Sequence, residues 1–324
     1  MSQDCILVIG ANGQIGTELV AALAQRHGAQ AVISSDIAAQ ARPETRQLGV
    51  RHVALDATDA PALQAVVVRF AVTQIYLLAA ALSARAEQHP AWAWDLNMKS
   101  LLNVLELARS HHLRVFWPSS IAAFGPSSPK VMTPQTTAMD PTSVYGISKL
   151  AGEGWCAWYH RNHGVDVRSL RYPGLVSWKT APGGGTTDYA VEIFHAALQR
   201  GRYTSFLAAG TALPMMYMPD AIRATLELMD APPECILQRS AYNVTGMSFT
   251  PAQLGHAIAR QLPGFAMDYA PDFRQAIANS WPQSIDDSEA CKDWGWKAQY
   301  DLEAMVHDML AHLRPLLEAS RKAA

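Results

Sequence analysis

Tyr145 and Lys149 stand four residues apart in the segment Tyr145-Gly-Ile-Ser-Lys149. On a helix, this spacing places both side chains on one face. A free phenol ionises only near pH ~10, but an ammonium about 5 Å away favours the phenolate by roughly 3.3 kcal/mol at an effective dielectric of about 20. We therefore expect the pKa of Tyr145 to fall by roughly 2.4, close to the range of a general base. Without further context, the same pair is also consistent with a solvated helix face.

The elements around this pair predict how it is positioned. A turn at Asp140-Pro-Thr142 and a glycine at Gly164 bound a helix over residues 143–162. Short apolar segments typical of buried parallel strands alternate with helical patterns at 17–27, 59–70 and 91–110, the strands being 5–9, 31–35, 52–55, 75–78 and 115–117. The alternation predicts an α/β fold, a Rossmann-type doubly wound parallel sheet that binds ligands at the carboxyl ends of its strands.

The first predicted strand leads directly into a glycine-rich turn. Gly10 permits the tight turn, Gly13 lets the backbone approach a pyrophosphate, and Gly16 allows close helix packing. The second strand ends on Asp36, where a carboxylate can hold both hydroxyls of an adenosine ribose and repels a 2′-phosphate. No Arg or Lys follows before Arg42. The pattern favours NAD over NADP, and the oxidised nicotinamide ring of NAD would further lower the pKa of Tyr145.

The later strand ends carry further candidates. Asp56 either contacts the adenine amino group or caps the next helix, and the small residues from Ala79 leave room for a cofactor. Ser83 is a candidate substrate contact or a simple cap. Ser119 and Ser120 follow the fifth strand, so the Ser120 and Tyr145 hydroxyls can reach one substrate oxygen. Of Asn97 and Asn103 in the helix before that strand, one is expected to anchor backbone beside the site.

Composition excludes several classes of protein. The chain has 324 residues, 49% of them apolar and 17% charged, with a net charge of −2. With no Lys/Arg run longer than a pair, a nucleic-acid or membrane surface is disfavoured and a small-molecule substrate is favoured. The cysteines lie far apart, which indicates buried reduced thiols rather than disulfides or a metal site: Cys5, Cys156, Cys235 and Cys291. The amino terminus lacks the pattern of a signal peptide, so we expect a cytoplasmic protein.

Several segments together, in this order and spacing, resemble the extended short-chain dehydrogenase/reductase family: Gly10-Ala-Asn-Gly-Gln-Ile-Gly16, Asp36, Ser119-Ser120-Ile-Ala-Ala-Phe-Gly125, Tyr145-Gly-Ile-Ser-Lys149, Leu170-Arg-Tyr-Pro173, Tyr217-Met-Pro-Asp220 and Asp293-Trp-Gly-Trp296. The resemblance implies that Tyr145 is the catalytic base, Lys149 its pKa-lowering and ribose-binding partner, and Ser120 the hydroxyl-polarising residue. It also implies Asn97 as the structural asparagine. The expected NAD contacts are Gly10, Asn12, Gly13, Gln14, Ile15, Gly16, Asp36, Asp56, Leu78, Ala79, Ala80, Ser119, Tyr145, Lys149, Tyr172 and Pro173.

Two longer stretches are more specific. Residues 171–191 and 280–287 closely resemble the short-chain type of L-threonine 3-dehydrogenases. This implies oxidation of the L-threonine β-hydroxyl to 2-amino-3-oxobutanoate without a metal, with hydride passing to nicotinamide. The run 183–185 is then a backbone nest for a carboxylate or a plain flexible loop. The expected substrate contacts are Ser83, Ser120, Tyr145, Gly184, Thr186 and Trp281.

Two alternatives stay open. Many relatives are sugar-nucleotide epimerases and dehydratases, but these typically carry an asparagine where this chain has Gly174. A non-catalytic redox sensor that binds dinucleotide is the other alternative, and the intact Tyr145 and Lys149 argue against it. We expect an NAD-binding core over residues 1–176 with returning pieces at about 215–246, and a mainly substrate-binding lobe over 177–324. The family also implies a homodimer paired through the helices at 91–110 and 143–162.

Overall fold

The computed structural model describes residues 4–180, 183 and 185–323, and the chain divides into two compact units. Unit 1 comprises residues 1–123, 144–171 and 222–242, and unit 2 comprises residues 124–143, 172–221 and 243–324. Each unit is assembled from segments far apart in the sequence. No described helix is both long and apolar enough to cross a membrane.

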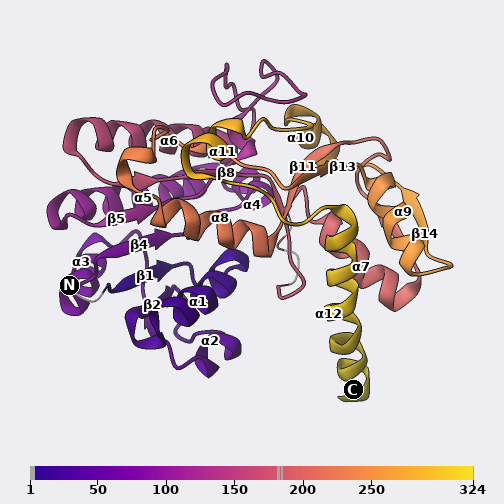
Figure 1. The fold of residues 1–324 in the computed structure, drawn as a ribbon, viewed down its shortest axis with the longest axis horizontal. Coiled ribbons are helices and arrows are strands. Elements are labelled where there is room, and N and C mark those ends of the chain that lie inside the picture. Colours follow the sequence, from indigo (N-terminus) through magenta and orange to yellow (C-terminus); the bar gives the residue numbers. More distant parts are fainter. Residues whose placement is uncertain (1–3, 181–182, 184, 324) are drawn as a thin grey trace. The chain divides into compact units, whose positions relative to one another are not determined.

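Unit 1 is built on a six-stranded parallel sheet (Figure 1). Its strand order is β3-β2-β1-β4-β5-β7, and all its neighbouring strands run parallel. The strands are β1 (Ile6–Ile9), β2 (Val32–Asp36), β3 (Arg51–Ala54), β4 (Gln74–Leu77), β5 (Arg114–Phe116) and β7 (Val167–Arg168). The order reverses between β1 and β4, as in a Rossmann sheet. The predicted α/β fold is confirmed.

Helices cover the faces of this sheet. They are α1 (Gln14–His27), α2 (Pro43–Gln47), α3 (Ala60–Phe70), α4 (Ser83–Gln88), α5 (Pro90–His111) and α6 (Val144–His163). The two long helices α5 and α6 pack side by side (Figure 1). Strand residues such as Leu7, Ile75 and Val115 are fully buried against helix residues such as Leu101 and Val104. This two-sided burial explains why the strands read as continuous apolar runs.

Most element bounds shift slightly from the predicted ones, and three elements show a larger difference in bounds or burial. Helix α1 starts at Gln14 because Gly13 is its extended N-cap, so the glycine turn runs straight into the helix. Strand β3 lies at the sheet edge, where none of its residues is buried. Within the returning pieces expected at about 215–246, the strand β12 is only two residues long (Tyr242–Asn243).

Unit 2 contains smaller sheets and a group of helices. Strands β9 (Gly174–Val176), β11 (Leu213–Tyr217) and β13 (Met247–Phe249) form one sheet, and β10 (Arg202–Ser205) pairs with β14 (Ala266–Tyr269). Helices α7 (Tyr189–Arg200), α9 (Pro251–Gln261) and α12 (Leu302–Ala323) pack together. The unit also holds α10 (Arg274–Ser280) and α11 (Ser288–Trp294).

Several elements lie at the boundaries of the two units. Strand β6 (Ser119–Ser120) of unit 1 pairs in a short sheet, order β12-β8-β6, with β8 (Leu170–Tyr172). Helix α8 (Met218–Asp230) begins in unit 2 and continues in unit 1. Short 3-10 helices cover Ala29–Ala31, Ile121–Ala123 and Pro233–Cys235.

Candidate active site

Tyr145, Lys149 and Ser120 come together in unit 1. Tyr145 and Lys149 lie on α6, and the Lys149 Nζ is 5.4 Å from the centre of the Tyr145 ring. Ser120 ends β6, and its side chain forms a hydrogen bond with that of Tyr145. Ser120 and Tyr145 both keep partial solvent exposure, whereas Lys149 is buried. The arrangement therefore presents two hydroxyl groups beside a buried amine.

Burial dominates the titration of this pair. Desolvation raises the pKa of Tyr145 to about 12, and only the hydrogen bond with Ser120 acts in the opposite direction. Desolvation also lowers the pKa of Lys149 to about 7, so the amine is only partly protonated at neutral pH. The pKa of Tyr145 is thus raised, whereas the sequence analysis expected it to fall. That expectation assumed a nearby ammonium in a medium of uniform dielectric. A further positive charge is needed before this phenol can act as a base near neutral pH.

The buried Lys149 side chain contacts Trp117 and Pro118. The Lys149 Nζ donates to the Pro118 carbonyl at 2.6 Å and lies 4.5 Å from the centre of the Trp117 ring. Gly152, one turn further along α6, packs on the same ring, and a Cβ added there would lie 2.3 Å from Trp117 Cη2. Only glycine at this position lets the helix approach the indole so closely.

Asn97 is the asparagine that anchors backbone beside the site. The Ala81 N–H donates to Asn97 Oδ1 at 2.8 Å, and Asn97 Nδ2 donates to Ser148 Oγ at 3.0 Å. Asn97 thereby joins the segment after β4 to α6, next to Tyr145. The side chain of Asn103 instead donates to the Ala57 carbonyl after β3. Asn97, and not Asn103, therefore contacts the segment beside Tyr145, and its role as the structural asparagine stays a prediction.

The structure adds a buried ion pair that the sequence analysis did not identify. Glu153 accepts two hydrogen bonds from Arg171, at 2.9 Å from Nε and 2.8 Å from Nη2. The Ser119 hydroxyl donates to the same carboxylate at 2.5 Å. A carboxylate four residues after Lys149, on the same helix face, was the signal available in the sequence.

The glycine-rich turn has the shape that a dinucleotide needs. Gly10 has φ +85°, and a Cβ there would lie 2.6 Å from the Ala79 N. At Gly16 a Cβ would lie 2.3 Å from the Gly10 carbonyl oxygen. The N-cap Gly13 provides no side-chain cap, so backbone N–H groups at the start of α1, including those of Gln14 and Ile15, are available to a pyrophosphate. The residues present fit NAD.

Asp36 closes the turn at the end of β2. Its Oδ2 accepts from the Asn12 N–H at 3.1 Å and its Oδ1 from the Ala38 N–H at 3.2 Å. Arg42 folds back onto the same turn, because its Nε donates to the Asn12 carbonyl at 2.7 Å. Asp36 is therefore hydrogen-bonded to the glycine turn. Its predicted preference for the ribose hydroxyls of NAD over a 2′-phosphate stays a prediction.

Asp56 does not cap α3. It accepts from the backbone and hydroxyl of Thr58, while Asp59 is the N-cap and accepts from the Ala62 N–H at 3.0 Å. The cap alternative for Asp56 is wrong, because Asp59 stands closer to the helix start. A contact of Asp56 with adenine stays a prediction.

The segment after β4 lies beside Tyr145. Leu78 and Ala79 both donate backbone N–H groups to the Ile9 carbonyl, which holds this segment against the end of β1. Ala81 belongs to a small buried cluster against which Tyr145 packs. Ser83 is buried and begins α4, where Leu82 is the N-cap, so Ser83 is not a cap. Ala80 is partly exposed in the same segment.

The remaining predicted residues lie in unit 2. Tyr172 and Pro173 are buried, and the Tyr172 hydroxyl donates to the Ala221 carbonyl at 3.4 Å. Thr186 and Trp281 are buried as well. Gly184 lies outside the described residues. The Gly185 N–H of the predicted nest donates to the Asp188 carboxylate at 2.8 Å, so a side chain of this protein uses that donor.

The cysteines are free in the structure, as expected. Only Cys156 is buried, however; Cys5 and Cys235 are partly exposed and Cys291 is exposed, so the expectation of uniformly buried thiols is wrong. Among the described residues, no group of three or more His, Cys, Asp or Glu side chains could hold a metal ion.

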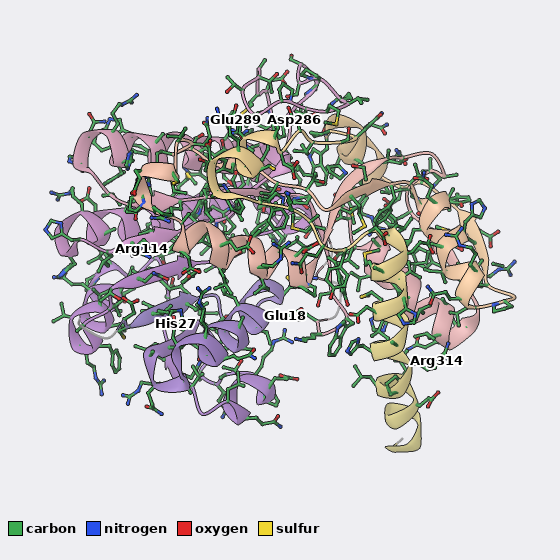
Figure 2. The ribbon with its side chains drawn as sticks, viewed as in Figure 1. Glu18, His27, Arg114, Asp286, Glu289 and Arg314 are labelled. Atoms are coloured by element: carbon green, nitrogen blue, oxygen red, sulfur yellow. The ribbon has the colours of Figure 1, made fainter. Side chains whose placement is uncertain are left out.

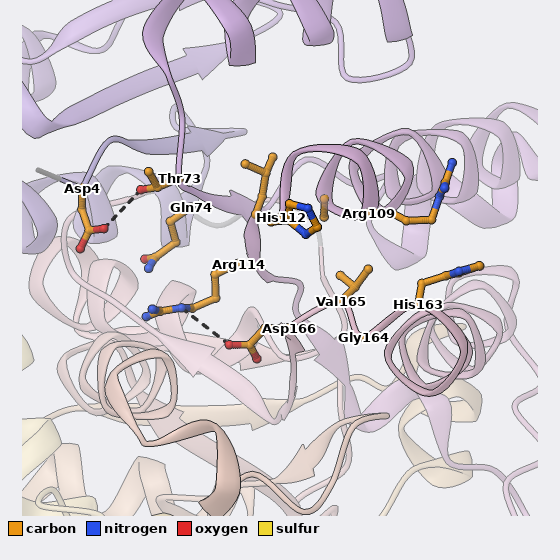
Figure 3. A pocket seen from close by; sticks show the side chains of 12 residues that line it. Asp4, Thr73, Gln74, Arg109, His112, Arg114, His163, Gly164, Val165 and Asp166 are labelled. Atoms are coloured by element: carbon orange, nitrogen blue, oxygen red, sulfur yellow. Dashed lines mark hydrogen bonds and ion pairs between the residues drawn. The ribbon is translucent and has the colours of Figure 1, made fainter. Parts of the chain in front are cut away.

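A polar cavity of about 400 Å³ lies elsewhere in unit 1 (Figure 3). Asp4, Gln74, Arg114 and Asp166 stand at or before the starts of their strands, so this cavity is at the amino ends of the sheet. Arg114, also labelled in Figure 2, lies 3.7 Å from Asp166, which is bound in turn by Arg168 at 2.8 Å. The candidate active site lies at the carboxyl ends of the strands, the edge at which such sheets bind ligands.

Comparison with known proteins agrees with this geometry. Residues 6–244 match the NAD dependent epimerase/dehydratase family. An uncharacterized epimerase/dehydratase of Staphylococcus haemolyticus is 48% identical over 94% of this chain and 96% of its own length. The solved holo form of a GalE-like L-threonine dehydrogenase from Cupriavidus necator is 64% identical, covering 95% of this chain and 99% of that chain, with a TM-score of 0.93.

A solved structure described as a monomeric L-threonine 3-dehydrogenase from a metagenome database, in its apo form, is 45% identical. It covers 96% of this chain and 99% of that chain with a TM-score of 0.92. Together with the glycine turn and the tyrosine–lysine pair, these similarities identify the chain as a member of the NAD-dependent epimerase/dehydratase family, an oxidoreductase whose cofactor is NAD.

Proposed function

We propose that this protein oxidises L-threonine at its β-hydroxyl to 2-amino-3-oxobutanoate. The observation that carries the proposal is the hydrogen-bonded pair of Ser120 and Tyr145 with Lys149 beside it. The choice of threonine is supported by the similarity to L-threonine dehydrogenases over nearly the whole chain.

In the proposed reaction, the Tyr145 phenolate takes the proton of the substrate hydroxyl while Ser120 hydrogen-bonds the same oxygen. When bound, NAD supplies the hydride acceptor and a positive charge next to the phenol. Lys149 stabilises the phenolate and holds the ribose. Because burial, partly offset by the hydrogen bond with Ser120, raises the pKa of Tyr145 to about 12, the proposal needs both positive charges for the phenol to ionise near neutral pH.

The proposed substrate contacts extend beyond the two hydroxyls. Ser83 of unit 1 is buried next to the alanine segment that packs on Tyr145. From unit 2 we assign Thr186 and Trp281 to threonine, together with Gly184, on the strength of the resemblance of their segments. We assign the NAD-binding role to unit 1 and the main substrate-binding role to unit 2.

The structure disfavours a sugar-nucleotide substrate. At Gly174, where many sugar-nucleotide enzymes carry asparagine, a Cβ would lie 2.4 Å from Met215 Sδ and 2.7 Å from Thr187 Cγ2. Met215 is fully buried, so the space that an asparagine side chain would use is filled. A non-catalytic sensor is disfavoured by the assembled Ser120, Tyr145 and Lys149.

We also propose a homodimer that forms through α5 and α6. Ile147, Trp155 and Trp158 form an apolar stripe on α6 and are 46%, 39% and 39% exposed. Large apolar residues gathered on one helix face are typical of a protein–protein interface. A cytoplasmic location stays a prediction from the sequence.

Purified protein supplied with L-threonine and NAD tests the activity by the absorbance of NADH. Formation of NADH in proportion to threonine consumed is the expected result. Conversion of a UDP-sugar with no net NADH would support an epimerase instead. Dinucleotide binding without turnover of either substrate would support the sensor.

A further inference from the structure

The ion pair of Glu153 and Arg171 lies one helical turn from Lys149, inside unit 1. The two side chains are only 3% and 4% exposed. A bidentate contact between a carboxylate and a guanidinium fixes both groups in one plane. Burying such a pair costs free energy of desolvation. The residues that the pair holds in place are therefore of interest.

The ion pair holds the strand that carries Ser120. The Ser119 hydroxyl donates to Glu153 Oε1 at 2.5 Å, and Arg171 belongs to β8, which pairs with β6. Glu153 therefore binds β6 through Ser119, and it binds the neighbouring strand β8 through Arg171. Ser120, the next residue, is the one bonded to Tyr145. The Glu153 carboxylate thus holds in place Ser120, one of the two hydroxyl residues Ser120 and Tyr145.

Glu153 also affects the charge of Lys149. Burial lowers the pKa of Lys149 to about 7, and the charges of Cys156 and Glu153 act in the opposite direction. Burial raises the pKa of the Cys156 thiol far above neutral pH, so the thiol is uncharged there. Tyr145 on the same helix and Arg171 on β8, which is paired with Glu153, also lie in this region. The Glu153 carboxylate is thus the charge that favours the Lys149 ammonium.

We propose that Glu153 is a positioning residue with two effects: through Ser119 it sets the place of Ser120, and its carboxylate, one helical turn from Lys149, favours the ammonium form of that side chain. It is not among the residues assigned to the substrate or the dinucleotide. The proposal deepens the proposed function, but its charge effect can be measured without any turnover.

The charge effect is tested by NMR titration of protein carrying [ε-¹³C]lysine, with the Lys149 signal assigned from a Lys149→Met variant. In Glu153→Gln the titration midpoint of Lys149 is expected to move to lower pH by about one unit or more, because the carboxylate no longer favours the ammonium. Glu153→Asp retains the charge and should restore the midpoint towards that of the wild type. An unchanged midpoint in Glu153→Gln overturns the charge effect.

Asp166→Asn is the matched control for this titration. It disrupts a partly buried ion-pair network of the same unit, at the amino ends of the strands, and should leave the Lys149 midpoint in place. An equal shift in Asp166→Asn would mean that loss of stability, rather than the Glu153 charge, moves the midpoint, and would also overturn the charge effect.

The positioning effect is tested with Ser119→Ala, which removes one hydroxyl and retains the ion pair. We expect kcat with threonine to fall by about 3-fold to 10-fold while the Lys149 midpoint stays unchanged. Wild-type kcat in Ser119→Ala would overturn the positioning effect. Ser119→Ala still tests the positioning effect if Glu153→Gln does not fold. If wild-type protein fails to oxidise threonine, the proposed function fails, whereas the NMR titration still tests Glu153.

Discussion

The phenol of Tyr145 lies in surroundings that oppose its ionisation. Its pKa of about 12 and the pKa of about 7 for Lys149 leave most molecules with a neutral phenol and a partly protonated amine at neutral pH. In the proposed reaction, a bound positive charge is then required for Tyr145 to act as the base. This dependence couples proton removal to occupation of the cofactor site.

The role of Tyr145 can be tested by Tyr145→Phe. We expect kcat to fall by about 10²-fold or more, because no other described hydroxyl takes its position on α6. NAD affinity should stay nearly intact, since the phenyl ring still fills the site. Steady-state kinetics and calorimetric NAD titration measure the two quantities. An unchanged kcat would remove the residue from its assigned role.

Asp36→Ala should chiefly weaken NAD. The carboxylate closes the glycine turn through the Asn12 N–H, so its loss removes both a ribose partner and a support of the turn. We expect the NAD dissociation constant to rise by about 10-fold or more, as for the loss of a charged hydrogen-bond partner. Asp4→Ala is the control: it removes an exposed aspartate just before the amino end of β1, which is not assigned to NAD. A defect of Asp36→Ala confined to threonine would contradict the assignment.

At the scale of elements, the turn between β1 and α1 depends on backbone geometry. Gly10→Ala places alanine at positive φ and pushes a methyl group towards the Ala79 N, which would lie 2.6 Å away. Positive φ costs of order 1–3 kcal/mol for alanine, and the contact adds to this cost. Gly28→Ala is matched, with φ +86° and no atom within 4 Å of the added Cβ.

We therefore expect Gly10→Ala to lower the free energy of unfolding more than Gly28→Ala does, and to weaken NAD as well. Urea denaturation and NAD titration of both variants measure these effects. Equal destabilisation of the two variants would show that the approach of β4 to the turn is unimportant.

The elements also show what the sequence could predict. The buried parallel strands and the two long helices were predictable because their apolar patterns follow directly from burial. The solvent exposure of β3 was not predictable, because its position at the sheet edge depends on the strand order. Glu153 was missed because its partners Ser119 and Arg171 come from separate strands, and no local pattern brings the three together.

At the scale of the whole molecule, the proposed dimer is tested by Trp158→Glu. A charge within the apolar stripe on α6 should prevent association and yield a monomer in sedimentation experiments. Leu237→Glu is the control, because Leu237 is 64% exposed and lies outside α5 and α6. The metagenome relative is described as monomeric, and wild-type protein that also sediments as a monomer would refute the dimer.

The substrate was the least predictable property of the whole molecule. The residues on α6 and β6 indicate oxidation of an alcohol, but they do not distinguish one alcohol from another. Threonine was suggested by resemblance over residues 171–191 and 280–287, which lie almost entirely in unit 2, and Gly184 in that region falls outside the described residues.

The contact between Gly152 and the Trp117 indole has one more consequence. A hydrogen atom, the smallest possible side chain, sets how deeply α6 sits, and hence where its phenol and amine stand. A larger side chain at residue 152 would tilt or raise α6 and slow turnover, although no hydrogen-bonding, ionisable or reactive group had been changed. An inactive variant at residue 152 would therefore report on lost alignment, and should not be interpreted as loss of a reactive group.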